Sequence, residues 1–182
     1  MTRRAPMLAA LLALCLVMAA PAAADPRGMR FGSTDGGEIA FGDWAGRPVL
    51  VANTASLCAF TDQYEGLQAL YDRYRGAGLV VLAVPSDDFR QELGTEKEVA
   101  AFCEVNFGLD LPMAEITSVR GPDAHPFYRW LNETHGLAPR WNFEKVLIGP
   151  DGALLGAWGS AVRPLGKPIV NAVEAALARP SG

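Results

Sequence analysis

Short apolar runs separated by polar turns recur along the chain and predict β-strands. Residues 48–52 (PVLVA) and 79–84 (LVVLAV) are continuous apolar runs of the length expected for strands buried on both faces. The turn sequence Pro150-Asp151-Gly152 lies between two further β-rich runs and predicts a hairpin. The five predicted strands cover residues 48–52, 79–84, 113–116, 143–148 and 153–158.

Apolar residues at helical spacing fill the intervals between these strands. Tyr64, Leu67, Leu70, Tyr71 and Tyr74 recur every three to four residues and predict a helix that begins soon after Phe60. Thr95 and Glu98 form a capping-box sequence that opens a second helix through about Asn106, which Gly108 ends. Two more helices are predicted over residues 124–133 and 165–177. This order predicts an α/β domain with a mixed sheet covered by helices on both faces, and a thioredoxin-like sheet fits the length and the closing hairpin.

The first 24 residues have the composition of an export signal. Arg3 and Arg4 precede an almost wholly apolar stretch over residues 7–20, and three alanines precede Asp25. This pattern is typical of a secretory signal peptide cleaved near Asp25, with a retained membrane anchor as the alternative. We therefore expect one domain over residues 25–182 in the periplasm or outside the cell. Residues 25–37, rich in Gly and Asp, are predicted to form a loose leader.

The charge of the chain limits its partners. Sixteen Lys and Arg side chains against twenty Asp and Glu give a net charge of −4, without a basic stripe. This pattern argues against nucleic acid or an anionic membrane surface as a partner. The sequence has no His/Cys cluster with zinc-site spacing, so no metal or other cofactor is expected.

Cys58 is the first candidate for chemistry. It follows a predicted strand and precedes a predicted helix, where free N–H groups stabilise a thiolate. A buried structural cysteine is the alternative interpretation of this position alone. Cys103 is the only other cysteine after residue 24, and an even number of thiols in an oxidising compartment suggests a disulfide. The two are not in a CxxC arrangement.

Five stretches together resemble the glutathione peroxidase family, in the family's order, over residues 39–177. They are NTASLCAFTDQYEGLQALYDRY, VVLAVPSDDFRQE, AAFCEVNFGLDLPM, AHPFYRWL and RWNFEKVLI. The resemblance implies that Cys58 is the peroxidatic cysteine. It implies that Gln91, Trp141 and Asn142 complete the catalytic tetrad, and that Cys103 is the resolving cysteine of thioredoxin-dependent, non-selenium members.

These residue types suit peroxide reduction. A thiolate attacks one peroxide oxygen, and the leaving oxygen gathers negative charge that fixed donors must stabilise. Gln91 and Asn142 offer amide N–H groups and Trp141 an indole N–H, none of which needs to titrate. Each also has an ordinary structural interpretation as a solvated, turn or core residue.

The chain departs from the family pattern in the loop before Gln91. Arg90 stands where glycines are common, and Asp87 and Asp88 form an acidic pair that disfavours an anionic substrate near the site. The segment between Leu131 and Trp141 is short, which resembles the monomeric members, whose open site admits bulky lipid hydroperoxides. His125 is interpreted as a structural histidine.

The resemblance implies a thiol peroxidase that reduces hydrogen peroxide and organic or lipid hydroperoxides. A Cys58–Cys103 disulfide would be recycled by a thioredoxin-like protein or glutathione. The alternative is a peroxide-sensing relay that oxidises a partner protein. A copper chaperone or disulfide carrier is less compatible, because no CxxC surrounds Cys58, and an inert domain with a structural disulfide is a fourth hypothesis. Since the cysteines lie on separate elements, we expect the helix of Cys103, held chiefly by Val99, Phe102 and Val105, to unwind before a disulfide forms.

Overall fold

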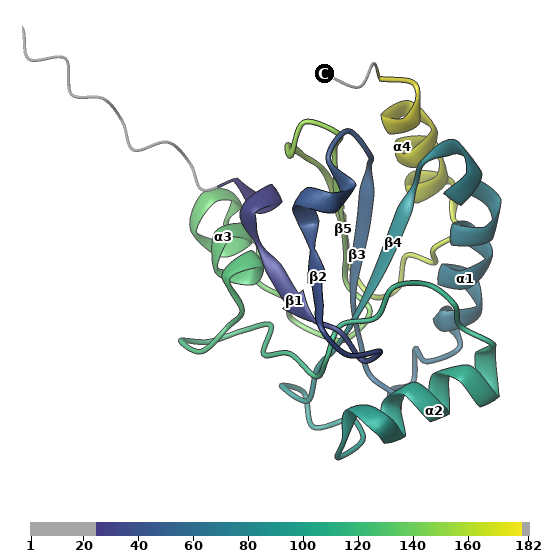
Figure 1. The fold of residues 1–182 in the computed structure, drawn as a ribbon, viewed down its shortest axis with the longest axis vertical. Coiled ribbons are helices and arrows are strands. Elements are labelled where there is room, and N and C mark those ends of the chain that lie inside the picture. Colours follow the sequence, from purple (N-terminus) through teal and green to yellow (C-terminus); the bar gives the residue numbers. More distant parts are fainter. Residues whose placement is uncertain (1–24, 180–182) are drawn as a thin grey trace, which may run out of the picture.

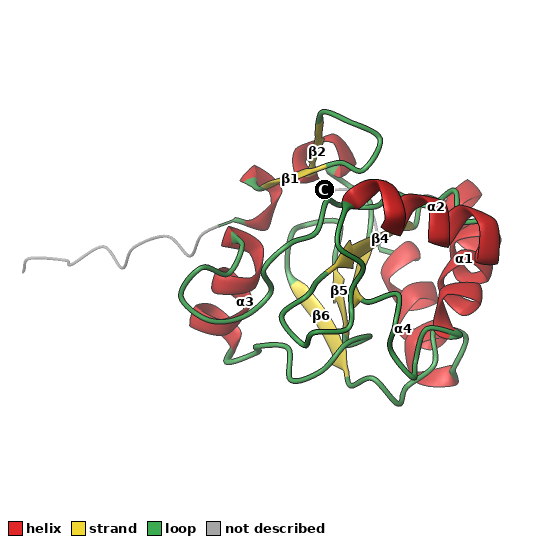
Figure 2. Cartoon of the chain, turned by 90° about the horizontal axis from the view of Figure 1, so that it is seen from below, coloured by secondary structure: helices red, strands yellow, loops and turns green. Residues whose placement is uncertain are grey.

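A four-stranded mixed sheet forms the centre of the molecule. The computed structural model describes residues 25–179, so the predicted signal peptide lies outside the described residues. The sheet has the order β4-β3-β5-β6, where β3 (Val49–Thr54) runs parallel to β4 (Val80–Pro85) and antiparallel to β5 (Lys145–Ile148). β6 (Leu154–Trp158) completes the predicted hairpin with β5. Figure 1 shows β5, β3 and β4 side by side in the middle of the fold, and Figure 2 labels β6 next to β5.

Every residue of β3 and β4 is buried, as their continuous apolar sequences predict. Alternate residues contact different layers, so Leu50 and Ala52 pack in one apolar cluster while Val49 and Val51 pack in the other. Both faces of the central strands are therefore covered, and the predicted mixed α/β architecture is confirmed.

Helices cover both faces of this sheet. α1 (Gln63–Tyr74) and α4 (Lys167–Leu177) pack on one face, and α3 (Pro126–His135) packs on the other. Figure 2 shows α3 separated from α1 and α4 by the strands. α2 (Glu96–Phe107) lies below the sheet in Figure 1 and packs against α1. Short 3₁₀ turns complete the list of helices: Pro26–Gly28, Phe41–Trp44 and Arg75–Ala77.

The N-terminal segment is more ordered than the sequence predicts. Residues 25–37 were expected to form a loose leader, but β1 (Arg30–Gly32) pairs antiparallel with β2 (Glu38–Ala40). The turn between them is made by Gly36 and Gly37, whose φ angles of 89° and 79° favour glycine. Phe31 is only 1% exposed and stacks on His125, with ring centroids 3.9 Å apart. The prediction was wrong because one buried phenylalanine, in a polar segment, fixes this hairpin.

The predicted strand over residues 113–116 is also corrected. This segment makes isolated bridges only, between Met113 and Ala83 and between Ala114 and Ser33. It thereby joins the edge of the central sheet to the β1–β2 hairpin without forming a ladder of its own.

Candidate active site

Cys58 lies on the loop that joins β3 to α1, as predicted. Its side chain is 7% exposed, and its sulfur accepts a hydrogen bond from the Phe60 backbone N–H at 3.5 Å. The Thr61 hydroxyl holds the turn by donating to the carbonyls of Cys58 at 2.6 Å and Ala55 at 3.0 Å. The loop therefore presents a nearly buried sulfur to a backbone N–H donor.

Two of the three predicted donors bind each other beside this loop. The Asn142 amide nitrogen donates to Gln91 Oε1 at 3.0 Å, and the Leu57 backbone N–H donates to the Gln91 carbonyl at 2.9 Å. The residue next to Cys58 is thus hydrogen-bonded to Gln91. Because Oε1 of Gln91 accepts from Asn142, the Gln91 Nε2 group keeps its two N–H donors for another partner.

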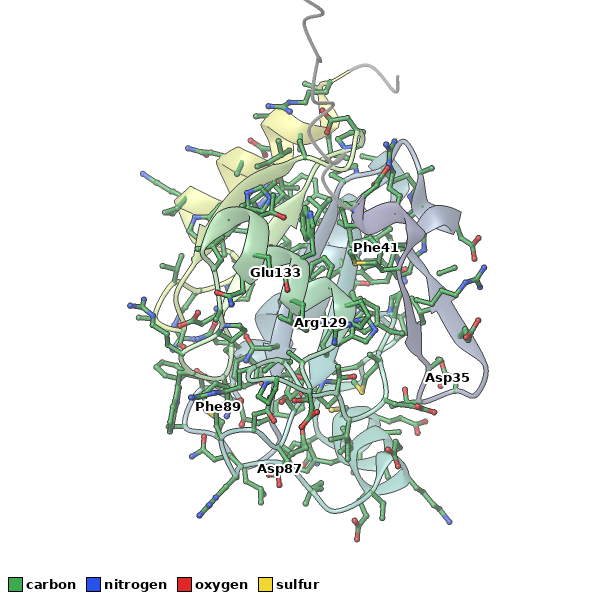
Figure 3. The ribbon with its side chains drawn as sticks, turned by 90° about the vertical axis from the view of Figure 1, so that its left-hand side faces the viewer. Asp35, Phe41, Asp87, Phe89, Arg129 and Glu133 are labelled. Atoms are coloured by element: carbon green, nitrogen blue, oxygen red, sulfur yellow. The ribbon has the colours of Figure 1, made fainter. Side chains whose placement is uncertain are left out.

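Trp141 lies at the surface next to the same loops. Its indole side chain is 41% exposed and packs against Phe89, with ring centroids 5.4 Å apart. Its backbone carbonyl accepts a hydrogen bond from Asn53 at 2.9 Å, which attaches it to the end of β3. Figure 3 shows Phe89 and Asp87 together at the lower end of the molecule, below α3.

A residue directly next to each amide donor has a strained backbone conformation. Arg90, directly before Gln91, has φ of 56°, and Phe143, directly after Asn142, has φ of 61°. Non-glycine residues adopt this left-handed conformation rarely, and it concentrates at functional sites. Arg90 therefore takes a conformation that a glycine would adopt without strain, and Gln91 still reaches Asn142.

The acidic pair before Gln91 anchors its loop. The Asp88 carboxylate accepts hydrogen bonds from the backbone N–H groups of Val119 at 2.6 Å and Arg120 at 3.0 Å. Asp87 Oδ1 accepts from the Glu92 N–H at 3.2 Å. Both carboxylates thus have a structural use that sequence reasoning missed, and their proposed effect on anionic substrates stays a prediction.

Glu92 is a site residue that the sequence analysis also missed. It is 8% exposed, and its Oε1 accepts from the backbone N–H groups of Ser56 and Leu93, both at 2.9 Å. Burial raises the pKa of this carboxyl group above its usual value, while the hydrogen bonds from Ser56 and Leu93 lower it. The only sign of this role in the sequence was that Glu92 directly follows Gln91. From sequence alone, a carboxylate at this position is expected to lie in solvent.

Cys103 is a buried free thiol on α2. It is 1% exposed and packs in the same apolar cluster as Cys58, which is also a free thiol. Burial is the main cause that raises the pKa of Cys103 to about 11, and the negative charge of Glu92 raises it further. The polar side chain of Tyr64 acts in the opposite direction and lowers this pKa. Val105 was expected to help hold this helix, but its side chain is 82% exposed. The buried residues of α2 are Val99 and Cys103.

His125 has a structural role at the start of α3. His125 is the N-cap of α3, where Nδ1 accepts from the Phe127 N–H at 3.2 Å and Nε2 lies 2.7 Å from the Arg30 carbonyl. Its structural interpretation is confirmed.

Among residues 25–179, no three or more His, Cys, Asp or Glu side chains are grouped to hold a metal ion. Within that range no helix is both long and apolar enough to cross a bilayer.

Comparisons with known proteins show the family of the chain. The profile of the glutathione peroxidase family matches residues 29–132. The hydroperoxy fatty acid reductase gpx1 of Synechocystis is 38% identical over 148 residues, which are 75% of this chain and 88% of that protein.

Solved structures extend the likeness to the whole fold. The crystal structure of Trgpx in apo form has a TM-score of 0.70 at 31% identity and covers 88% of this chain and 100% of its own. A thioredoxin family thiol:disulfide interchange protein from Chlorobium tepidum has a TM-score of 0.63 at 15% identity, over 86% and 99% of the two chains. The latter confirms the thioredoxin-like fold alone. Together, the family profile and the relatives show that this chain belongs to the glutathione peroxidase family and is a peroxidase.

Proposed function

We propose that Cys58 is the peroxidatic thiol of a cysteine-type peroxidase that reduces hydrogen peroxide and organic or lipid hydroperoxides. The observation that supports this most strongly is the hydrogen-bonded connection of the Cys58 loop through Leu57 to Gln91 and from Gln91 to Asn142. It places an oriented amide donor next to the loop of a nearly buried sulfur, which is what cleavage of an O–O bond requires.

In the proposed first step the Cys58 thiolate attacks the terminal peroxide oxygen. The S–O bond forms while the O–O bond breaks, so the sulfur is oxidised to the sulfenic acid and the leaving oxygen departs as an alkoxide or hydroxide. A proton from the solvent converts this anion to an alcohol or water. The N–H groups of Gln91, Trp141 and Asn142 stabilise the charge on that leaving oxygen. They need no change of protonation to do so.

A cavity lies mainly against the apolar cluster that packs with α3, while Cys58 packs in the cluster on the other face of the sheet. It has a volume of about 360 Å³ and lies between α3, the segment 136–140 and the sheet, with Leu131, Leu137 and Trp158 among its walls. Asn53, which binds the Trp141 carbonyl, also lines it. Its lining does not include Cys58, Gln91, Trp141 or Asn142, and it carries the charged residues Arg140, Glu144 and Lys145. The use of bulky hydroperoxides is therefore proposed from the short segment between Leu131 and Trp141 and not from this cavity.

We infer that Cys103 resolves the sulfenic acid and that the resulting disulfide is recycled by a thioredoxin-like protein or glutathione. The signal-like sequence of residues 1–24 supports export to the periplasm or beyond, so the reductant is expected in that compartment. The short segment between α3 and Trp141 supports a monomer.

Matched serine variants of the two cysteines test this proposal. Cys58→Ser is expected to abolish peroxide consumption. Cys103→Ser is expected to form the sulfenic acid at the wild-type rate and then stop in assays with a thioredoxin system. Stopped-flow oxidation followed by mass mapping measures both steps. Turnover above background in Cys58→Ser would reject the assignment, and wild-type disulfide chemistry with slow peroxide turnover would favour a redox relay.

A further inference from the structure

Lys145 carries a buried ammonium group that the peroxide chemistry described above does not use. It lies on β5, is 1% exposed, and is the one buried Lys or Arg side chain in the described part of the chain. Its hydrogen-bond partners are neutral oxygens and not a carboxylate. A charge that is taken out of water without a counter-ion costs stability. This cation therefore calls for an explanation beyond the packing of the core.

The Nζ group of Lys145 donates to one side chain and to two backbone carbonyls. The carbonyls belong to Val162, at 2.6 Å, and to Ser160, at 3.4 Å, in the loop 159–163 that leads from β6 to α4. The side chain is that of Gln63, which accepts through Oε1 and donates through Nε2 to the Ser160 carbonyl at 2.7 Å. Gln63 is 2% exposed and is the first residue of α1. Lys145 and Gln63 together therefore attach the start of α1 to the loop 159–163.

The start of α1 is hydrogen-bonded to the turn that carries Cys58. The Gln63 backbone N–H donates to the Phe60 carbonyl at 2.9 Å, and the Phe60 N–H donates to the Cys58 sulfur at 3.5 Å. Leu147, two positions after Lys145 on β5, packs in the same apolar cluster as Cys58. Because side chains alternate along a strand, the Lys145 side chain lies on that same face of the sheet. A continuous series of contacts thus runs from the Lys145 ammonium group to the peroxidatic sulfur.

The exposed contact at this place is weaker than the buried ones. Asp62, the N-cap residue of α1, makes no capping hydrogen bond to the helix. It forms an ion pair with Arg163 at 2.9 Å, but both side chains are more than half exposed. Exposed ion pairs contribute little, because water and salt screen them. The buried hydrogen bonds of Gln63 and Lys145 therefore hold the start of α1 more firmly than this ion pair does.

Resting on the proposed function, we propose that Lys145 is a positioning residue for the reaction of Cys58 with peroxide. It acts through Gln63 and touches none of the reacting atoms. By fixing Gln63 it fixes the turn over residues 60–63, and the fixed turn keeps the Phe60 N–H directed at the Cys58 sulfur. A reacting group that is held in place before the reaction needs no reorganisation during it, which is why a distant contact affects the rate.

The charge on Lys145 determines the pH range of this attachment. An ammonium group has three N–H donors and serves three acceptors, whereas a neutral amine has only two. Burial lowers the pKa of Lys145 to about 8, the positive charge of Arg163 in the adjoining loop also lowers it, and the carboxylate of Glu144 on the β5 side raises it. On the α1 side, the carboxylate of Asp62 is paired with Arg163. As the pH rises through about 8, one acceptor loses its donor and the attachment weakens.

Lys145→Met tests the proposal, because methionine keeps an apolar stem and removes every donor. Lys167→Met is the matched control, since Lys167 is an exposed lysine at the start of α4. Gln63→Met, alone and combined with Lys145→Met, completes a double-mutant cycle. Stopped-flow oxidation by hydrogen peroxide is measured from about pH 6 to pH 10. Each rate is divided by the thiolate fraction of Cys58, obtained from alkylation and mass mapping of the same variant, so that a change in ionisation is not mistaken for a change in positioning.

We expect Lys145→Met to slow the corrected oxidation of Cys58 about tenfold at pH 7, within the range that a displaced reacting group costs. Gln63→Met should slow it by a similar factor, and the double variant no more than either single variant, because both changes break one attachment. The corrected wild-type rate should fall with a midpoint near pH 8, and Lys145→Met should lack this fall. The control should match the wild type throughout.

A wild-type rate in Lys145→Met, or additive losses in the double variant, would overturn the role of Lys145. If Lys145→Met fails to fold, Gln63→Met and the wild-type pH profile decide instead. A wild-type rate in Gln63→Met, or a corrected wild-type rate that stays constant through pH 8, would then overturn the proposal. Absence of Cys58 oxidation in the wild type would overturn the proposed function itself.

Discussion

Loosening the start of α2 should speed disulfide formation without affecting the peroxide step. Thr95 is the N-cap of this helix, where its hydroxyl accepts from the Glu98 N–H at 3.3 Å and donates to the Glu98 carboxylate at 2.9 Å. Cys103 is buried on the same helix and is a free thiol, as is Cys58 on its separate loop, and we expect this helix to open before the disulfide forms. Thr95→Ala removes the cap and makes that opening easier.

The size of the effect follows from the cap. Loss of a threonine N-cap costs about 1 kcal/mol of helix stability, which corresponds to about a fivefold larger open population. Few other contacts compensate, because only Val99 and Cys103 of α2 are buried. If opening precedes the attack as a rapid equilibrium, disulfide formation speeds up by the same factor of about five.

Amide hydrogen exchange over residues 96–107 and rapid-quench disulfide formation measure opening and chemistry in the same variant. Thr134→Ala is the control, since Thr134 is an exposed threonine on α3. Both quantities should rise about fivefold in Thr95→Ala and stay constant in the control. Faster exchange in α2 with unchanged disulfide formation would show that opening of this helix does not precede resolution.

Three further results are expected. Gln91→Ala, Asn142→Ala and Trp141→Phe should each slow stopped-flow oxidation of Cys58 about ten- to a thousandfold, and wild-type rates in all three would contradict the donor assignment. Burial lowers the pKa of Lys145 from 10.5 to about 8, so above pH 8 the unfolded chain holds a proton that the native state has lost. The free energy of unfolding should therefore gain a component that rises between about pH 8 and pH 10.5, and denaturant titrations of Lys145→Met should lack it. Alkylation of Cys103 should rise about tenfold per pH unit up to about pH 11, and a plateau by pH 9 would contradict its raised pKa.

The order of strands and helices was predictable because local patterns of apolar and turn-forming residues indicate it. Continuous apolar runs identify β3 and β4, which must be buried on both faces, and the turn at Pro150-Asp151-Gly152 identifies the hairpin. The position of Cys58 between a strand and a helix follows from the same patterns. Local signals failed where one residue decided the outcome, as with Phe31 in the β1–β2 hairpin and the exposed Val105.

Only the tertiary structure could pair the polar groups of the site. Asn142 donates to Gln91 across 51 residues of sequence, and Ser56 donates to Glu92 across 36. A buried polar side chain needs a hydrogen-bond partner, and here that partner lies on another loop that is distant in the sequence. The sequence therefore determined which residues carry the chemistry that the family requires. The folded chain decided that Glu92 is buried against the Cys58 loop, because burial and backbone hydrogen bonds are properties of the packed structure.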